Sequence, residues 1–425
     1  ELSDRKEVSG TTMKAIISGA GIGGLTAALC LHNIGYDVEV YEVVSDLQPL
    51  GVGINLLPHG AAVLHNLGLG KKLDESGVRT QAIEYRTKFG HVITSDPRGV
   101  DAGFEFPQYS IHRGILQFIL LDAARVRLGP DAIKTGAGIS SFSQNDIGVT
   151  AHLARAETNS RFSSVDGDIL IGADGFHSVL RKALHPNEGP TRYEGMMMWR
   201  GVNEHPSFGD ARTMFIAGNH DVKLVCYPIS GKDEATGTAQ INWVAEFREG
   251  KPRRAITADW NQRGNLDFIK HFQFFEMKDI DIIRLLKGTK EIFEYPMVDR
   301  DPLPWWSKGR VTLLGDAAHP MYPVGANGAS QAILDGAALA EALVSASPQQ
   351  GLIAYEKERL GKTTDVVLAN RKWGPEKVLD LADEKIKGPN DRIEDHISSD
   401  EIEAVARNYR QIAGFQKKRE SDTRL

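Results

Sequence analysis

Cysteine is nearly absent from this sequence: among 425 residues only Cys30 and Cys226 carry thiols, and both stand in apolar surroundings. Two distant thiols make neither the disulfide framework of a small secreted protein nor a set of metal ligands. We therefore expect buried, reduced cysteines in a cytoplasmic protein that holds no metal.

Long apolar runs and clusters of one charge are also missing. No apolar stretch approaches the ~20 residues of a membrane-spanning helix. Acidic and basic residues are mixed along a chain whose net charge is −6, so the sequence predicts neither a membrane span nor a nucleic-acid partner. No serine–histidine–aspartate order or metal-ligand spacing stands out. His112 and His319 lie near motifs, but neither is assigned a catalytic role.

Apolar residues are nevertheless plentiful. With 41% hydrophobic and 8% aromatic residues, the chain can bury sizeable cores, and its length suits two or three domains better than one. Residues 1–12 are polar and lead directly into an apolar stretch at Met13. We expect them to be a disordered extension or a remnant of cloning.

The first recognisable pattern is MKAIISGAGIGGLTAALCLHNIGYDVEVYE, which begins at Met13. It predicts a strand, a glycine turn, a helix and a second, parallel strand. In a dinucleotide fingerprint Gly19 permits the tight turn, Gly21 lets the backbone approach a pyrophosphate and Gly24 lets helix and strand pack closely. Glu42 ends the second strand, where a carboxylate accepts from a ribose hydroxyl. The alternative is a purely structural βαβ unit.

Two more strand–turn–helix junctions follow much later in the chain. GADGFHSVLR spans 172–181, and GRVTLLGDAAHPMYPVGANGASQAILDG spans 309–336. In the second, an apolar strand runs into Asp316 and a helix begins after the loop, an arrangement that holds anionic groups. Taken singly, each junction is compatible with ordinary packing: Ser178 and Arg181 would then lie on an ordinary surface, and the later motif would be a capped junction.

The three motifs together are more specific than each alone. G-x-G-x-x-G near the start, G-A-D-G-x-x-S-x-x-R in the middle and G-D-A-A-H-P near the end resemble the single-component, FAD-dependent aromatic hydroxylases. That flavoprotein monooxygenase family includes salicylate and p-hydroxybenzoate hydroxylases. The resemblance runs from Met13 to about Arg371. Within the family, PLGVGIN, PQYSIHRG, MWRGV, YPMVDRDPLP and MYPVGANGASQAILDG are similar to members that modify phenazine carboxylates.

The resemblance implies that one FAD uses both ends of the chain, with its ADP half at the early glycines and its riboflavin half at the late motif. Asp316 would bond the ribityl chain, and a helix N-terminus at 325–329 would stabilise the anionic reduced flavin. Asp174 would lie near the pyrophosphate and take part in handling NAD(P)H, and Arg113 would contact FAD. The predicted cofactor-binding residues are Gly19, Gly21, Gly23, Gly24, Glu42, Gly53, Arg113, Asp174, Asp316, Pro323, Gly325, Asn327, Gly328 and Ala329.

The chain departs from the family pattern at two places. Many relatives have arginine where this chain has Gln48, and losing that cation should weaken one contact to the FAD phosphates or to a mobile flavin. The loop often written P-x-L-G-Q-G is here PVGANG, residues 323–328, with Asn327 in place of glutamine and the glycines shifted. The local backbone path is therefore not carried over from the family.

The resemblance also implies the fold, which is α/β: a Rossmann-like FAD-binding domain of the glutathione-reductase type, an inserted, mainly antiparallel substrate sheet, and C-terminal helices. β-rich runs at short intervals from Met196 to Phe247 agree with it, and Ser398 or Ser399 is expected to cap a late helix. The expected ranges are 13–80, 100–182 and 297–372 for the FAD-binding domain, 81–99 and 183–296 for the substrate domain, and 373–425 for the C-terminal helical segment.

By the same resemblance, the protein is an FAD-dependent monooxygenase that consumes NADH or NADPH. It would insert one oxygen atom of O2 into an aromatic or heteroaromatic substrate through a flavin C4a-hydroperoxide. Because the flavin carries the chemistry, no side chain is assigned as catalytic, and the protein supplies position and dryness. An apolar pocket is expected between the inserted sheet and the flavin. Its candidate residues, each equally compatible with plain core packing, are Trp199, Leu224, Tyr227 and Pro323.

Other readings stay open at this point. The same fold occurs in reductases of isoprenoid double bonds and in lipid-binding relatives that no longer catalyse a reaction, and an epoxidase or a Baeyer–Villiger-type oxygenase would use the same flavin chemistry. The sequence contains no obvious arginine–tyrosine pair for clamping a carboxylate, so an aromatic acid as substrate rests on the family alone. The choice between NADH and NADPH, and that between a monomer and a homodimer, also stays open.

Overall fold

We describe the protein from a computed structural model, which covers residues 12–155, 158, 160–250, 262–372 and 376–412. The expected extension at 1–12 therefore lies outside the described residues apart from Thr12. No helix within the described ranges combines the length and the apolar composition that crossing a bilayer requires.

The first half of the fold is a parallel sheet in the order β18-β12-β1-β2-β8. Its central strands β1 and β12 and the neighbouring β18 are almost entirely buried and mostly apolar, because other elements cover both faces. The prediction that the first two strands are parallel is confirmed by the pairing of β1 with β2. The strands are β1 (Lys14–Ser18), β2 (Asp37–Glu42), β8 (Ile133–Thr135), β12 (Ile169–Gly172) and β18 (Val311–Leu313).

Four long helices pack around this sheet and on one another. They are α1 (Ile22–Asn33), α4 (Arg113–Leu128), α7 (Gly328–Leu343) and α8 (Pro348–Asn370). Helices α1 and α7 approach closely because small residues meet: a Cβ added at Gly336 would lie 2.9 Å from the backbone nitrogen of Ala27. This close contact brings the early glycine motif beside the late one, although the two are about 300 residues apart in the sequence.

The second half of the fold is a seven-stranded sheet in the order β17-β13-β16-β15-β14-β5-β6. Its neighbours are antiparallel except for β14 and β5, which are parallel. Strands β5 and β6 form a hairpin whose turn contains KFGH, residues 88–91. The strands are β5 (Ala82–Arg86), β6 (Val92–Pro97), β13 (Arg192–Pro206), β14 (Thr213–Gly218), β15 (Val222–Pro228), β16 (Thr238–Arg248) and β17 (Ile292–Asp299).

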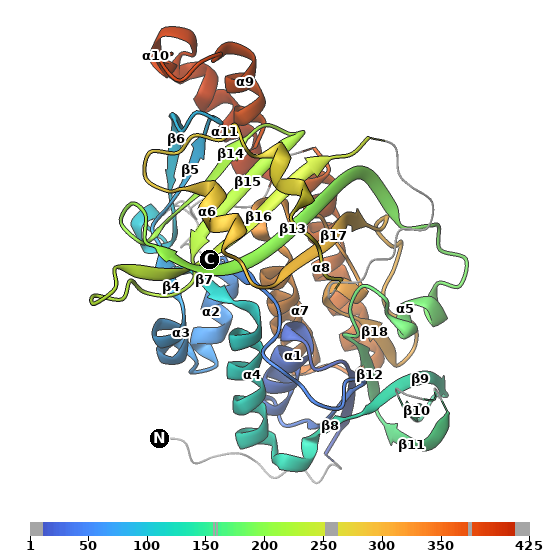
Figure 1. The fold of residues 1–425 in the computed structure, drawn as a ribbon. Coiled ribbons are helices and arrows are strands. Elements are labelled where there is room, and N and C mark those ends of the chain that lie inside the picture. Colours follow the sequence, from blue (N-terminus) through green and yellow to red (C-terminus); the bar gives the residue numbers. More distant parts are fainter. Residues whose placement is uncertain (1–11, 156–157, 159, 251–261, 373–375, 413–425) are drawn as a thin grey trace.

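The seven-stranded sheet is covered on both faces. One face packs on an aromatic core that includes Trp243, Phe268 and Phe272. The other face looks toward the parallel sheet and its helices, which lie below it in Figure 1. Because side chains alternate between the faces of a strand, every second residue of β13, β15 and β16 points toward the cofactor half of the molecule.

Shorter elements complete the chain. Two antiparallel sheets have the orders β3-β7-β4 and β11-β10-β9, and the second lies at the far end of the parallel sheet (Figure 1). Their strands are β3 (Gly53–Leu56), β4 (Val78–Thr80), β7 (Gln108–His112), β9 (Ala137–Gln144), β10 (Val149–Arg155) and β11 (Arg161–Gly167). The 3-10 turns are η1 (Gly99–Ala102), η2 (Pro130–Ala132), η3 (Asp267–His271), η4 (Gly315–Ala317) and η5 (Val324–Ala326).

The remaining helices are short or lie late in the chain. They are α2 (Pro58–Asn66), α3 (Gly70–Ser76), α5 (Val179–Leu184), α6 (Ile282–Lys287), α9 (Lys377–Lys385), α10 (Ile393–His396) and α11 (Ser399–Ile412). The predicted serine cap is confirmed at Ser398, whose Oγ accepts from the backbone N–H of Glu401 at 3.3 Å. The Glu401 carboxylate accepts the backbone N–H of Ser398 in return, which is a capping box. Helix α9 packs on β14, β5 and β6 and covers that edge of the large sheet.

Candidate active site

A cavity of about 560 Å³ lies between the two halves of the fold. Its walls come from the glycine turn before α1, from β3, from the start of α4, from the loop between β18 and α7, and from the inner face of the seven-stranded sheet. On one side the cavity borders the motifs that predict a nucleotide. On the other side it borders the large sheet, a surface on which a second molecule can bind.

The early glycines adopt the geometry that a dinucleotide needs. Gly19 has a φ of 104°, and a Cβ there would lie 2.4 Å from the carbonyl oxygen of Ala173. A Cβ at Gly24 would lie 2.1 Å from the carbonyl oxygen of Gly19, so this turn closes only with glycine. Gly21, by contrast, faces open cavity, with nothing within 4 Å of a Cβ. A pyrophosphate can approach the backbone there.

Glu42 stands at the end of β2, where the sequence predicts the ribose contact. One carboxylate oxygen accepts the backbone N–H of Ala20 and the other that of Val44, each at 2.9 Å. These bonds fix the orientation of the carboxylate beside the glycine turn. Each carboxylate oxygen offers more than one acceptor site, so Glu42 remains able to accept from a ribose hydroxyl.

The cofactor end of the cavity pairs one cation with one carboxylate. Arg113 begins α4 and Asp316 lies in η4, and both side chains are exposed to the space of the cavity. Burial raises the pKa of Asp316, and the nearby His319 and Arg113 oppose that shift. Burial likewise lowers the pKa of Arg113 against the attraction of Asp316. A hydrogen-bond acceptor, Asp316, and a donor, Arg113, thus face the same space. The polar ribityl chain of a flavin requires both.

His319 is held by an aspartate beneath this wall. Its Nε2 lies 2.5 Å from Oδ2 of Asp335, the same oxygen that accepts the backbone N–H of Gly315 at 3.0 Å. Arg359 donates to the other oxygen of Asp335 at 2.7 Å. These contacts tie α7 and α8 to the turn that carries Asp316. The histidine therefore supports the loop.

The loop between β18 and α7 curls tightly at the cavity wall. Gly325 and Ala326 have positive φ angles of 72° and 54°, a conformation that favours glycine. Pro323, Gly325, Gly328 and Ala329 all line the cavity, so the N-terminus of α7 opens onto it. This is the backbone path that the departure from the family loop left undefined.

The backbone along the cavity tests whether the site fits a flavin. A Cβ added at Gly21 would meet nothing within 4 Å, and Gly21 lines one end of the cavity. Gly328 and Ala329, at the N-terminus of α7, line it further along. Two stretches of accessible backbone N–H groups fit an elongated, anionic cofactor such as FAD. Asn327 itself is buried and does not line the cavity.

Gly53 and Asp174, which are both predicted to bind the cofactor, differ in whether they line the cavity. Gly53 lines the cavity, and its backbone N–H donates to the Asn242 side chain at 2.7 Å. The Asp174 carboxylate instead caps α5: it accepts from the Ser178 hydroxyl and, at 2.9 Å, from the backbone N–H of Val179. Its neighbours 173 and 175 form the cavity wall. Asp174 thus shapes the turn in this structure, and burial raises the pKa of its carboxyl.

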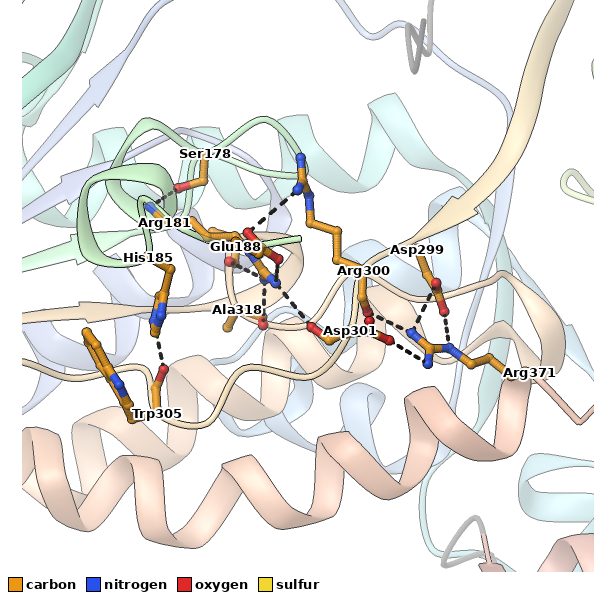
Figure 2. A network of polar contacts seen from close by, with 11 residues as sticks. Ser178, Arg181, His185, Glu188, Asp299, Arg300, Asp301, Trp305, Ala318 and Arg371 are labelled. Atoms are coloured by element: carbon orange, nitrogen blue, oxygen red, sulfur yellow. Dashed lines mark hydrogen bonds and ion pairs between the residues drawn. The ribbon is translucent and has the colours of Figure 1, made fainter. Parts of the chain in front are cut away.

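The middle motif contains a buried brace that the sequence did not reveal. Arg181, which could have been an ordinary surface residue, is buried and donates to the carbonyls of Ala317 and Ala318 at 3.0 and 2.9 Å. It also binds Glu188 through two nitrogens. Figure 2 shows Arg181 pointing from α5 toward the G-D-A-A-H-P segment. The middle motif therefore holds the late one in place.

The same network continues to α8. Arg371 donates to both carboxylate oxygens of Asp299, at 2.7 and 3.2 Å, and to Asp301 at 2.9 Å. Arg300, between those two aspartates, forms an ion pair with Glu188 at 3.5 Å (Figure 2). The segment that follows β17 is thereby fastened to both α5 and α8, and this fixes the junction of the two sheets.

The predicted pocket residues divide between the two faces of the large sheet. Tyr227 and Pro323 line the cavity. Trp199 and Leu224 point to the opposite face, where Trp199 stacks on Phe268 with 5.0 Å between ring centroids. The alternation of the strands explains this, because the inward positions are the neighbours of Trp199 and Leu224. These inward residues include Met198, Arg200 and Val225.

Arg200 is a cation in the middle of this wall. It lies on β13 opposite Val244 of β16 and Phe293 of β17, which both line the cavity. Its guanidinium carbon lies 5.7 Å from the centroid of the Tyr295 ring. Burial lowers the pKa of Arg200 to about 10, so the side chain is cationic at neutral pH. The sequence offered one clue, a charge within an otherwise apolar run.

Comparison with known proteins gives a consistent result. The family model described as "FAD binding domain" matches residues 12–369. The phenazine 1,6-dicarboxylic acid hydroxylase PhzS of Lysobacter antibioticus is 43% identical over 365 residues, which is 85% of this chain and 90% of that protein. The 3-amino-4-hydroxybenzoate 2-monooxygenase of Streptomyces cremeus is 31% identical over 83% of this chain and 85% of its own.

A solved structure matches the fold over nearly its whole length. Klebsiella pneumoniae HpxO, complexed with FAD and uric acid, superposes with a TM-score of 0.71 at 24% identity, and the match covers 95% of this chain and 93% of that one. At this identity the likeness concerns the arrangement of the chain. It agrees with the predicted α/β fold, in which a nucleotide-binding half carries a large inserted sheet.

Proposed function

Because the chain belongs to the FAD-dependent aromatic hydroxylases, we propose that its substrate is an aromatic or heteroaromatic carboxylate whose carboxylate group lies against Arg200. The enzyme is an FAD-dependent monooxygenase that hydroxylates an aromatic ring, with NAD(P)H and O2 as co-substrates. When bound, FAD accepts the hydride and activates oxygen. We also propose that it works in the cytoplasm, where NAD(P)H is supplied, as a monomer or a homodimer.

The placement of Arg200 carries the substrate proposal. Two other arginines reach the cavity: Arg113 faces Asp316 at the cofactor end, and Arg98 forms an ion pair with Asp96 at 3.6 Å. Arg200 stands on the sheet wall between Val244 and Phe293, at the end of the cavity away from the glycine turn. A buried guanidinium in such a wall favours an anionic ligand, because Arg–carboxylate bonds are charge-assisted and bidentate. The substrates named for both curated relatives carry a carboxylate.

Different parts of the cavity wall have different roles in the proposed reaction. The early glycines and the N-terminus of α7 hold the cofactor at one end of the cavity. The apolar side chains of the sheet, Met198, Val225 and Val244, exclude water from the space beside it. Arg200 fixes the orientation of the ring by its carboxylate. Dryness matters because water in this space diverts reduced flavin and O2 to H2O2.

The test compares carboxylates with neutral amides. We expect oxidation of NADH or NADPH by the FAD-loaded protein to be stimulated by aromatic carboxylates, with little H2O2, and not by the corresponding carboxamides. Arg200→Met should raise KM for the carboxylate about 10- to 100-fold, the equivalent of one or two charged hydrogen bonds. Equal stimulation by acid and amide, or an unchanged KM in the variant, would refute the assignment of Arg200.

A further inference from the structure

Beyond Arg200, three ionisable side chains meet at the inner wall of the large sheet. Lys223 of β15, Glu246 of β16 and Glu376 at the start of α9 are 2%, 3% and 6% exposed. The Lys223 ammonium lies 2.8 Å from Oε2 of Glu246 and also bonds the carboxylate of Glu376. Both glutamates line the cavity. We refer to these three residues as the acidic triad.

The acidic triad contains one more carboxyl than cation. Removing an unpaired carboxylate from water is costly unless another group compensates it. Burial, together with the neighbouring Glu376, raises the pKa of the Glu246 carboxyl against the attraction of Lys223. The strands that carry the triad place the apolar side chains of Val225 and Val244 beside it on the cavity wall.

A second triad on the same sheet shows a different solution. On the opposite face Arg86 pairs with Glu84 at 2.6 Å and with Asp279 at 2.8 Å. There, too, two carboxylates share one cation. However, the side chains of Glu84 and Asp279 are 22% and 33% exposed, so water reaches them. Water can compensate the carboxylates of the second triad. At the acidic triad, a molecule bound in the cavity takes that place.

The strand register sets the distance from the triad to Arg200. Glu246 lies opposite Met198, two residues before Arg200 on the same strand, and all three face the cavity. Two residues along a strand correspond to about 7 Å. The wall therefore presents a cation and a surplus carboxyl separated by roughly the width of a fused aromatic ring system.

We propose that Glu246 and Glu376 form a subsite for a hydrogen-bond donor of the substrate: a ring hydroxyl, an amino group or a protonated ring nitrogen. This rests on the proposed function, with the substrate carboxylate at Arg200. Lys223 is a positioning residue that holds the two carboxyls side by side. The enzyme thus selects aromatic acids that carry a donor on the side of the ring away from the carboxylate.

The subsite also depends on the C-terminal part of the chain. Glu376 precedes α9, which packs on β14 and on the β5–β6 hairpin. Lys223 and Glu376 are 153 residues apart in sequence. The edge helix therefore contributes directly to selectivity, and a change that loosens α9 would weaken donor binding before it affects the FAD site.

The experiment measures binding of two matched probes to the FAD-loaded protein. 6-Hydroxy-2-naphthoate carries the donor and 2-naphthoate lacks it, and both are titrated against the flavin absorbance. We expect the wild-type protein to bind the hydroxyl probe at least about 10-fold more tightly, as one charge-assisted hydrogen bond provides. Glu246→Gln and, separately, Glu376→Gln should reduce this preference to about 3-fold or less, with little change for 2-naphthoate.

Matched variants separate the possible outcomes. Glu84→Gln makes the same substitution in the second triad and should leave the preference unchanged. Arg200→Met should weaken both probes and keep their ratio, so a failure of the carboxylate assignment is distinguishable from a failure of the subsite. Glu376→Gln retains the Lys223–Glu246 pair if Glu246→Gln does not fold. Equal wild-type affinities, no binding of either probe, or a preference that survives both glutamine variants would overturn the proposal.

Discussion

We expect Arg181→Met to destabilise the protein by about 3–4 kcal/mol. The Arg181 side chain is 2% exposed and is bonded to one carboxylate and to two backbone carbonyls of the G-D-A-A-H-P segment. Removing one partner of a buried ion pair costs about 3–5 kcal/mol. The lower part of that range applies because Glu188 keeps an ion pair with Arg300 at 3.5 Å and is itself 16% exposed. Methionine preserves most of the side-chain volume.

The assay is urea denaturation of the apoprotein, followed by FAD titration. The freed carbonyls belong to the residues directly after Asp316, so FAD affinity should fall along with stability. Arg192→Met is the matched control: that arginine is 43% exposed, and its pairs with Glu194 and Asp301 lie at the surface. It should change stability by no more than about 1 kcal/mol. If the two variants unfold alike, the buried brace is not what holds the late motif.

Four further variants address the cofactor end and the pH response. Gly24→Ala should lower both the melting temperature and the FAD content, because its Cβ would lie 2.1 Å from the carbonyl oxygen of Gly19, whereas Gly21→Ala should lower only FAD affinity. Asp316→Asn should weaken FAD at least about 10-fold in a fluorescence titration, since a charged acceptor is lost. Burial and Arg359 lower the pKa of His59 to about 4, so the folded state binds fewer protons than the unfolded state between pH 4 and 6.5. Stability should therefore fall on acidification through that window, and His59→Gln should reduce this fall in denaturation curves.

Each of these predictions has an outcome that would contradict it. A Gly24→Ala protein with full flavin content would mean that the turn is not sterically closed. An Asp316→Asn protein that binds FAD normally would move the ribityl contact elsewhere. Parallel pH–stability curves for His59→Gln and the wild type would show that the neutral histidine contributes nothing to the acid response.

Local patterns predicted the cofactor half well. The run at Met13 specifies its own strand, turn and helix, because glycine spacing and a change of hydrophobic period act over a few residues. The α/β fold and the large inserted sheet followed from the resemblance. The substrate wall could not be predicted in the same way. Both faces of the sheet are buried, so the central parts of β13 and β15 carry apolar residues on both sides, and a one-residue error exchanges the faces. For this reason the prediction that Trp199 and Leu224 line the cavity was wrong.

The charged residues of the wall are a weak signal in the sequence. Arg200, Lys223 and Glu246 each interrupt an apolar strand, and a charge in such a place requires a buried partner or a ligand. The sequence does not show that Lys223 meets Glu376, because their contact depends on how α9 returns across the sheet. The brace at Arg181 was hidden in the same way, since its acceptors are backbone carbonyls far along the chain.

The strand order of the parallel sheet has a consequence for synthesis on the ribosome. Strand β1 is made first, yet it lies at the centre of the sheet between β2 and β12, and β12 in turn pairs with β18 at residues 311–313. Such non-local pairing slows folding, because distant segments must meet before they stabilise each other. The emerging chain therefore exposes apolar strand edges until about three quarters of it has been made. We expect FAD to be acquired only near completion of the chain and chaperones to be needed until then.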